Sequence, residues 1–324
     1  MNTYCGTYAA VLSQRAQTGE LDLAAFQQQL RFLAETSLRG VALNGATGEF
    51  CATSNSELPE LLQTAKQLLP GRQILCGIGT ATLQGTLARG RLAIQHGADT
   101  LLLPSPYFFP YRQDDVSEFI SAVASELNCP ILLYNLPQFT TELNVETVLN
   151  LFEKHANLVG IKDSSGSLDI ARAMTQAGSN RARLIGNDSA LCEALKEGVC
   201  DGVVSGVACV LPELMTALVE QGGKTALMDL RLLLEEFIAR ISVLPTPWGL
   251  QVTSALRGLG VGAHALPLSH QRNVEITDLK NWFGPWVRSA EMSQIILNSS
   301  KYCKFENYKA TTMLSRVFTC DQDS

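Results

Sequence analysis

Eight short apolar runs alternate with longer amphipathic stretches through the first two thirds of the 324 residues. Each run is apolar along most of its length, which is typical of strands buried on both faces of a parallel sheet. Eight strand–helix units predict an α/β fold, a (β/α)8 TIM barrel, and an open doubly wound sheet is the alternative. The runs are Tyr8–Leu12, Gly40–Leu43, Gln73–Cys76, Thr100–Leu103, Ile131–Tyr134, Leu158–Ile161, Arg183–Ile185 and Gly202–Val204.

The stretches between and after the runs indicate how far the barrel extends. Apolar residues recur there at the spacing of amphipathic helices, and beyond Val210 only this helical spacing remains. We therefore expect the barrel core over residues 1–208, and the final barrel helix with a C-terminal helical extension over residues 209–290. Residues 291–324 lose the periodicity and predict a tail of uncertain order.

Composition excludes several classes of function. Hydrophobic residues make up 46% of the chain, which argues against disorder, and 25 basic against 31 acidic residues give a net charge of −6. Without a basic stripe, we expect no nucleic-acid partner. No apolar run reaches about 18 residues, so we expect no membrane span.

The cysteines and histidines point to the compartment and limit the chemistry. The nine cysteines are odd in number and widely spaced, and none forms a C-x-x-C pair. The N-terminus has no secretory signal, so we expect reduced thiols in a cytoplasmic protein. The four histidines lie in no metal-binding or cysteine-peptidase motif, so we expect no metal site.

In a barrel of this type, the site lies at the C-terminal ends of the strands. The second run is followed by N-G-A-T-G-E, residues 44–49. Two glycines let backbone N–H groups converge, so this loop could hold a small carboxylate with help from the Thr47 hydroxyl. A glycine-rich turn with a capping threonine is the alternative, and for this motif alone it is the commoner one.

A tyrosine and a lysine follow two neighbouring runs. Tyr134 opens Y-N-L-P after the fifth run, and Lys162 follows the sixth run in G-I-K-D-S-S-G. Loss of water at the barrel mouth would disfavour the ammonium form of Lys162, and a neutral amine can attack a ketone to form a Schiff base. The structural alternatives are a core tyrosine, and a lysine that reaches solvent or pairs with Asp163.

Small-residue turns follow the seventh and eighth runs. They are Gly186-Asn187-Asp188 and Val203-Val204-Ser205-Gly206, and both leave room for a substrate. Asp188 could bind substrate hydroxyls or cap the helix that follows it. Capping is the interpretation we favour from sequence, because aspartate is a preferred N-cap residue.

The three motifs together carry a family resemblance. Thr47 in G-x-T-G-E, Tyr134 in Y-N-x-P and Lys162 in G-x-K-D-[ST] occur in this order on the second, fifth and sixth runs. The chain thus resembles, from about Gly6 to Pro285, the dihydrodipicolinate synthase / N-acetylneuraminate lyase family of pyruvate-dependent class I aldolases. The resemblance implies a covalent Schiff base between Lys162 and a 2-keto acid such as pyruvate, with no other cofactor, and Tyr134 as the proton shuttle.

The resemblance also implies binding residues and an assembly. Thr47 and the backbone at Ala46 would hold the pyruvate carboxylate, and the backbone of Val204 would contact pyruvate. The remaining expected substrate-binding residues are Ser164 and Gly186. Tyr107, in S-P-Y, would be a relay tyrosine that crosses a tight dimer interface, in a homotetramer built from two such dimers.

Two departures from the family pattern bear on the substrate. Ala46 stands where a relay hydroxyl is common, and Phe139 stands where dihydrodipicolinate synthases carry an arginine that holds the second substrate's carboxylate. We therefore expect an aldolase that cleaves or forms a 2-keto-3-deoxy or 4-hydroxy-2-oxo acid from pyruvate and an aldehyde. The alternative within the family is a 4-hydroxy-tetrahydrodipicolinate synthase, which uses pyruvate and aspartate semialdehyde.

Two further hypotheses come from other classes of protein. Gly77-Ile78-Gly79 and Asp99 partly match a dinucleotide-binding fingerprint, but Thr82 stands at the position of its last glycine. This makes a nicotinamide-dependent oxidoreductase the weaker hypothesis. The other is a non-catalytic relative that binds a keto acid as a sensor, which Ala46 and Phe139 motivate.

Overall fold

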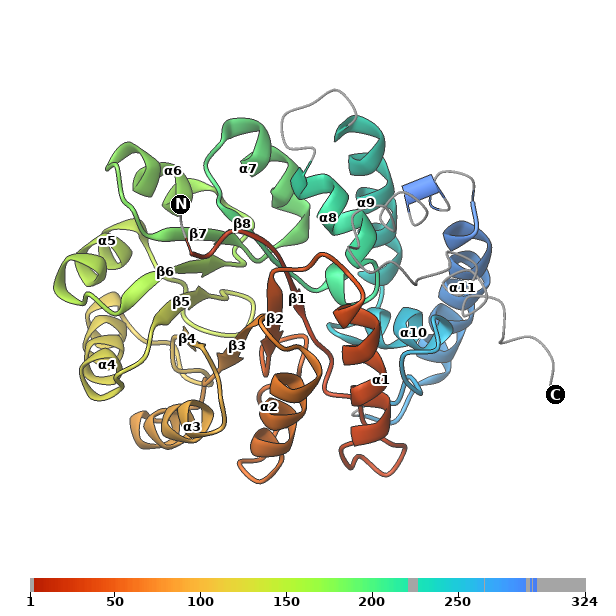
Figure 1. Ribbon diagram of the computed structural model, residues 1–324, viewed down its shortest axis with the longest axis horizontal. Helices are drawn as coiled ribbons and strands as arrows, with labels where there is room; N and C mark the ends of the chain where they lie inside the picture. Colours follow the sequence, from red (N-terminus) through yellow and green to blue (C-terminus); the bar gives the residue numbers. More distant parts are fainter. Residues whose placement is uncertain (1–2, 221–226, 265, 290–291, 293, 296–324) are drawn as a thin grey trace.

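Eight parallel strands close into a barrel in the computed structural model of the chain (Figure 1). Each strand pairs with the next, and β1 pairs with β8, so the expected (β/α)8 barrel is confirmed and the open doubly wound sheet is wrong. The structure describes residues 3–220, 227–264, 266–289, 292 and 294–295. The strands are β1 (Gly6–Ala10), β2 (Gly40–Leu43), β3 (Gln73–Gly77), β4 (Thr100–Pro104), β5 (Ile131–Asn135), β6 (Leu158–Asp163), β7 (Ala182–Ile185) and β8 (Gly202–Ser205).

Helices follow the strands and cover the outside of the barrel, and three more helices extend the chain beyond it (Figure 1). The barrel helices are α1 (Leu23–Ala34), α2 (Glu57–Leu68), α3 (Leu83–Gln95), α4 (Gln113–Glu126), α5 (Val145–Lys154), α6 (Asp169–Gln176), α7 (Leu191–Glu197) and α8 (Pro212–Glu220). Two short 3-10 helices, η1 (Asp188–Ala190) and η2 (Val207–Cys209), precede α7 and α8. The extension consists of α9 (Leu227–Ile241), α10 (Trp248–Leu256) and α11 (His270–Val287).

Alternation along the strands divides the buried side chains into two cores. Successive residues of a strand point to opposite faces, so one set fills the barrel and the other packs under the helices. On β6, Ile161 belongs to the outer core. Lys162 must therefore point into the barrel, as Tyr134 does on the neighbouring strand β5.

The helices of the extension pack beside α8 and α1 at one side of the barrel (Figure 1). Arg257, the C-cap of α10, makes a bidentate ion pair with Glu213 of α8, and the two side chains are only 4% and 1% exposed. The Arg257 guanidinium also lies 4.7 Å from the centroid of the Phe32 ring on α1. This pair therefore fixes α10 relative to the barrel.

Three further expectations concern the C-terminal tail, membrane spans and the dinucleotide-binding fingerprint. Apart from Met292 and residues 294–295, the predicted tail over 291–324 lies outside the described residues. No helix in the described part of the chain has the length and apolarity needed to cross a membrane. The dinucleotide fingerprint has another explanation, because Thr82 caps α3 and the Asp99 carboxylate accepts from the backbone of Ile74.

We predict that Arg257→Met lowers the free energy of unfolding by about 3–5 kcal/mol, because it leaves the Glu213 carboxylate buried without a partner. Adding Glu213→Leu should recover most of this loss. The control is Arg91→Met, which breaks a half-exposed pair with Glu126 and should cost less than about 1 kcal/mol. Urea unfolding measures all four proteins, and a loss for Arg257→Met no larger than for Arg91→Met would contradict the role of the buried pair.

Candidate active site

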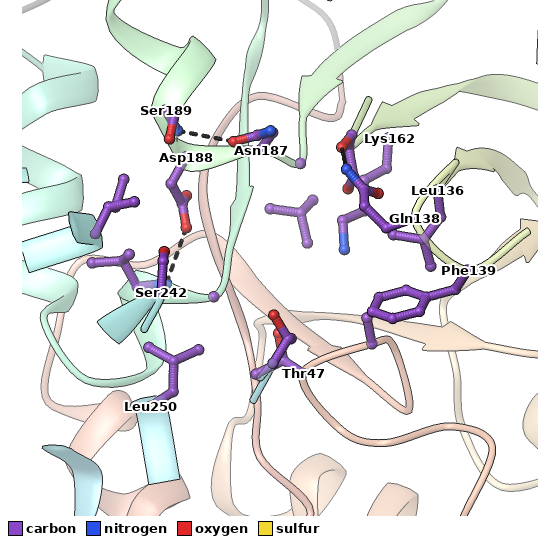
Figure 2. Close-up of a pocket in the computed structure, with 18 of the residues that line it drawn as sticks. Thr47, Leu136, Gln138, Phe139, Lys162, Asn187, Asp188, Ser189, Ser242 and Leu250 are labelled. Carbon is purple, nitrogen blue, oxygen red and sulfur yellow. Dashed lines mark hydrogen bonds between the residues drawn. The ribbon is translucent and has the colours of Figure 1, made fainter. Parts of the chain in front are cut away.

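A pocket of about 250 Å³ opens among the C-terminal ends of the barrel strands (Figure 2). It brings together seven of the eight expected site residues, which are Ala46, Thr47, Tyr134, Lys162, Ser164, Gly186 and Val204. Tyr107, the eighth, does not line it. The motifs that are far apart in sequence therefore meet at one place, at the end of the barrel where such sites lie.

Lys162 is held at the wall of this pocket by strand register. It pairs with Tyr134 across β5 and β6, and its side chain is buried with 3% of its surface exposed. The Lys162 Nζ atom lies 4.1 Å from the centroid of the Tyr134 ring. No carboxylate among the described residues forms an ion pair with Lys162, so the expected alternative of a pair with Asp163 is wrong.

The next residue on each of these strands points the other way and fixes the strand ends. The Asn135 side chain donates from Nδ2 to the Asp163 carboxylate at 3.0 Å and accepts from the Leu143 backbone at 2.9 Å. Asp163 also accepts from the backbone of Ser165. Burial raises the pKa of Asp163 in spite of these bonds. The Asn135–Asp163 hydrogen bond thus ties β5 to β6 one residue beyond Tyr134 and Lys162.

Gly186 leaves the space in which the lysine side chain lies. A Cβ atom at this position would come within 2.1 Å of the Ser164 hydroxyl and within 3.0 Å of Lys162 Cε. The Ser164 backbone is itself fixed, because its N–H donates to Asn135 and its carbonyl accepts from the Gln138 side chain at 2.9 Å. A side chain at 186 would therefore displace the amine or the serine.

The loop of residues 45–49, which we call the cradle loop, lies across the pocket from the lysine (Figure 2). Among the described residues, no backbone or side-chain acceptor takes the N–H groups of Ala46 and Thr47. The Thr47 hydroxyl also has no partner in the described part of the chain. Free amide and hydroxyl donors in a buried turn are a suitable site for a carboxylate. Ala46 contributes no hydroxyl, as the sequence indicated.

Asp188 lies in the pocket and does not cap the helix that follows it. Asn187 caps η1 by accepting from the Ser189 backbone, so the expected capping role of Asp188 is wrong. Asp188 Oδ2 accepts instead from the backbone of Val207 at 3.2 Å, and Oδ1 is buried with no partner among the described residues. Burial raises the pKa of this carboxyl. A buried acceptor without a donor is suited to bind a hydroxyl of a ligand.

The aromatic segment after β4 contains Tyr107, whose role across a dimer interface stays a prediction. The Tyr107 ring is partly buried and packs edge-on against Phe50 of the same chain, with centroids 5.6 Å apart. The next two rings are exposed, and Phe108 is 82% exposed with a left-handed φ of 86°. Phe108 is therefore the ring that projects most strongly from this segment.

Sequence reasoning did not anticipate that the C-terminal extension lines the site. Ile238, Ile241, Ser242 and Thr246 come from α9 and the segment after it, and Leu250 comes from α10. The helical periodicity that predicted these helices carries no information on which face meets the barrel mouth. The remaining lining residues, for which the sequence carries no functional signal, are Leu136, Gln138, Asn187, Ser189, Gly206 and Val207.

Metal ligation has no support in the described residues, where no cluster of three or more His, Cys, Asp or Glu side chains could hold an ion. The pocket chemistry consists of one amine, one phenol, one carboxylate and several hydroxyl, amide and backbone groups. An amine beside a phenol and an anion-binding loop is a suitable set for covalent chemistry on a keto acid.

Comparison with known proteins finds a family sequence model, a related sequence and a solved structure that each match most of this chain. The sequence model of the Dihydrodipicolinate synthetase family matches residues 3–281. A 4-hydroxy-tetrahydrodipicolinate synthase from Exiguobacterium sibiricum is 32% identical over 276 residues, which cover 82% of this chain and 92% of that protein. The solved structure of the 4-hydroxy-tetrahydrodipicolinate synthase from Methylacidiphilum fumariolicum has a TM-score of 0.82 at 26% identity and covers 90% of this chain and 99% of that chain.

A further solved structure shares the fold at lower identity. It is the dihydrodipicolinate synthase from Acinetobacter baumannii, determined in complex with pyruvate. Its TM-score is 0.79 at 21% identity, and the match covers 86% of this chain and 98% of that chain. At this identity the likeness extends to the barrel architecture alone.

We predict that Asp188→Asn stabilises the protein at neutral pH. The raised pKa means that the folded state holds a proton that the unfolded chain releases, so Asp188 makes the protein less stable as pH rises from the ordinary aspartate pKa towards the raised value. Asparagine keeps an acceptor for the Val207 N–H without the charge. The gain should therefore be small near pH 4, grow as pH rises and then level off.

Urea unfolding between about pH 4 and about pH 8 measures this dependence. Asp278→Asn, on the exposed face of α11, is the control and should change stability by no more than about 0.5 kcal/mol at any pH. A loss of stability for Asp188→Asn at neutral pH would contradict the assignment of Asp188 as a buried carboxyl with a raised pKa.

Proposed function

The chain belongs to the dihydrodipicolinate synthetase family, whose members are pyruvate-dependent lyases and aldolases, and we propose that it acts through a Schiff base on Lys162. The observation that carries this proposal is the buried Lys162 amine, which has no ion-pair partner among the described residues and lies beside the Tyr134 ring. Only an uncharged amine attacks a carbonyl, and the Tyr134 phenol beside Lys162 is a group that can exchange a proton with the amine. The enzyme needs no cofactor beyond this lysine.

The reaction begins at the keto carbon. Lys162 Nζ attacks the C2 carbonyl of the keto acid, water leaves, and a protonated imine forms. For cleavage, a base removes the proton of the C4 hydroxyl, the C3–C4 bond breaks, and its electron pair moves through C3 to the imine nitrogen. The aldehyde departs, the enamine takes a proton at C3, and hydrolysis of the imine releases pyruvate. The synthetic direction is the same sequence reversed.

Tyr134 is the group placed to move these protons. Its ring faces the amine, and its hydroxyl makes no hydrogen bond with the described residues. The hydroxyl lies 4.0 Å from the position that a Cβ atom of Gly45 would occupy, which puts it above the cradle loop. Since Ala46 has no hydroxyl, the proton on Tyr134 must be exchanged through substrate or solvent in the pocket.

The keto-acid carboxylate fits the cradle loop. The free N–H groups of Ala46 and Thr47 and the Thr47 hydroxyl provide donors for it, and they lie across the pocket from Lys162. The Acinetobacter baumannii synthase of the same fold binds pyruvate, which supports a keto acid as the first substrate.

The rest of the pocket favours a neutral hydroxyaldehyde as the second substrate. No cationic side chain other than Lys162 lines the pocket in the described part of the chain. Phe139, Ile238 and Ile241 form apolar walls, and the partnerless Oδ1 of Asp188 provides an acceptor for a hydroxyl. We therefore propose cleavage or formation of a 2-keto-3-deoxy or 4-hydroxy-2-oxo acid.

A second candidate is the 4-hydroxy-tetrahydrodipicolinate synthase reaction. The name of the relative from Exiguobacterium sibiricum favours it. Its second substrate, aspartate semialdehyde, carries a carboxylate, for which this pocket offers no arginine at position 139.

We further propose a homotetramer built from two dimers, in the cytoplasm. The exposed Phe108 and Phe109 rings project from the segment that contains Tyr107, and an exposed aromatic surface next to an active site is typical of a face covered by another protein. The described cysteines are free thiols, which supports a reducing compartment. Sedimentation velocity of the full chain measures the assembly.

We predict that borohydride reduction in the presence of pyruvate adds to the protein the mass of pyruvic acid less one oxygen atom, and that peptide mapping places the adduct on Lys162. Lys162→Ala and Lys162→Arg should give no adduct and should lower turnover by about a thousandfold or more. Lys280→Ala, at an exposed lysine of α11, is the control and should react like the unaltered protein.

The circular dichroism spectra of Lys162→Ala and Lys162→Arg should match the spectrum of the unaltered protein, because a change at the pocket wall leaves the outer core intact. Full turnover by Lys162→Ala would refute the nucleophile. Binding of pyruvate without an adduct would instead favour the keto-acid sensor.

We predict that Phe139→Arg raises the ratio of kcat/KM for aspartate semialdehyde to kcat/KM for a neutral hydroxyaldehyde by about tenfold or more, because the guanidinium can bind a carboxylate with two hydrogen bonds. Phe139→Leu, which removes the ring without adding charge, is the matched control and should not favour the semialdehyde. A preference of the unaltered protein for aspartate semialdehyde, unchanged by Phe139→Arg, would assign the synthase reaction.

A further inference from the structure

Two residues with left-handed backbone flank the glycines of the cradle loop, and neither is glycine. Asn44 has a φ of 53° and Glu49 has a φ of 50°. A side chain makes this conformation unfavourable by about 1 kcal/mol or more, so it persists only where the surroundings hold it. The conformation of both residues determines where the N–H groups of Ala46 and Thr47 point.

The two residues are held from opposite sides. Asn44 donates from its side chain to the carbonyl of Gly77, at the end of β3. Glu49 accepts, through Oε2, a hydrogen bond of 3.0 Å from Nε2 of Gln251 on α10. The barrel thus holds one end of the cradle loop, and the C-terminal extension holds the other.

The Gln251 amide is itself held in one orientation. Because its Nε2 donates to the Glu49 carboxylate, its Oε1 faces Nδ1 of His264 at 3.0 Å and accepts a hydrogen bond from the N–H of that nitrogen. The His264 ring packs against Trp248, with ring centroids 4.9 Å apart. Gln251 is 7% exposed and does not line the pocket, so it has no contact with a substrate there.

We infer that Gln251 is a positioning residue, which keeps Glu49 in its left-handed conformation and so keeps the cradle loop ready to bind the keto-acid carboxylate. The inference rests on the proposed function. It gives the C-terminal extension a role in substrate affinity that is separate from the pocket walls it supplies. The loop should not unfold without Gln251, because Ser13 also donates to the Gly48 carbonyl at 2.8 Å.

Borohydride trapping over a range of pyruvate concentrations tests the inference. Gln251→Leu should raise the half-saturating pyruvate concentration about tenfold, while the fraction trapped at saturation stays unchanged. KM for the keto acid should rise in the same way, with little change in kcat. An unchanged half-saturating concentration would overturn the inference.

Substitutions at Glu49 separate backbone positioning from general packing. Glu49→Gly and Glu49→Ala both remove the carboxylate, but only glycine adopts the left-handed conformation without penalty. Glu49→Gly should therefore bind pyruvate more tightly than Glu49→Ala. Adding Gln251→Leu to Glu49→Gly should not weaken pyruvate binding further. If Gln251 acts only through packing, Gln251→Leu would weaken pyruvate binding equally in the unaltered protein and in Glu49→Gly, and this result would overturn the inference.

Amide hydrogen exchange of the cradle loop gives a readout that does not depend on catalysis. Exchange at the N–H groups of Glu49 and Phe50, which donate to the carbonyls of Ala46 and Gly45, should become faster in Gln251→Leu than in the unaltered protein. If the unaltered protein traps no pyruvate, the proposed function fails and the binding part of the inference fails with it. Equal exchange rates in Gln251→Leu and the unaltered protein would overturn the positioning role, whether or not the protein traps pyruvate.

Discussion

The pairing of β5 with β6 beyond Ile131, where the register shifts, is the constraint on which the site depends. It places Tyr134 opposite Lys162 on the inner face of a closed barrel, and Asn135 opposite Asp163 on the outer face. The outer pair is joined by a hydrogen bond, so the strand ends that carry the inner pair cannot separate or slip. A slip of one residue would turn the amine out of the barrel. Strand register therefore fixes the amine and the phenol more firmly than any contact between the two side chains.

Much of this arrangement can be predicted from the sequence, because it depends on local patterns. Each of the eight apolar runs overlaps a strand, since burial on both faces leaves a continuous signal that a parallel barrel requires. The meeting of Thr47, Tyr134 and Lys162 follows from topology, because parallel strands end at the same edge. These predictions needed no knowledge of how distant side chains pack.

The rest depends on packing between distant segments, for which the sequence has no local signal. Asp188 accepts from Val207 across two loops and leaves the cap to Asn187, and both residues are equally good caps by type. The pocket residues from α9 and α10 have ordinary helical spacing. Tyr107 lies against Phe50 while Phe108 points outwards, because the left-handed backbone at Phe108 redirects the chain at this point.

The site gathers features that destabilise a folded protein, and the extension helps to hold them. Two left-handed residues, Asn44 and Glu49, flank the glycines of the cradle loop, and the pocket buries an amine without an ion-pair partner among the described residues and a carboxyl with a raised pKa. Each is unfavourable by itself, and such features persist only where the surrounding structure is rigid. The buried pair of Arg257 and Glu213 fixes α10 on the barrel, and α10 in turn carries Gln251 to Glu49. The helices that follow the barrel are therefore part of the structure that keeps the binding loop in place.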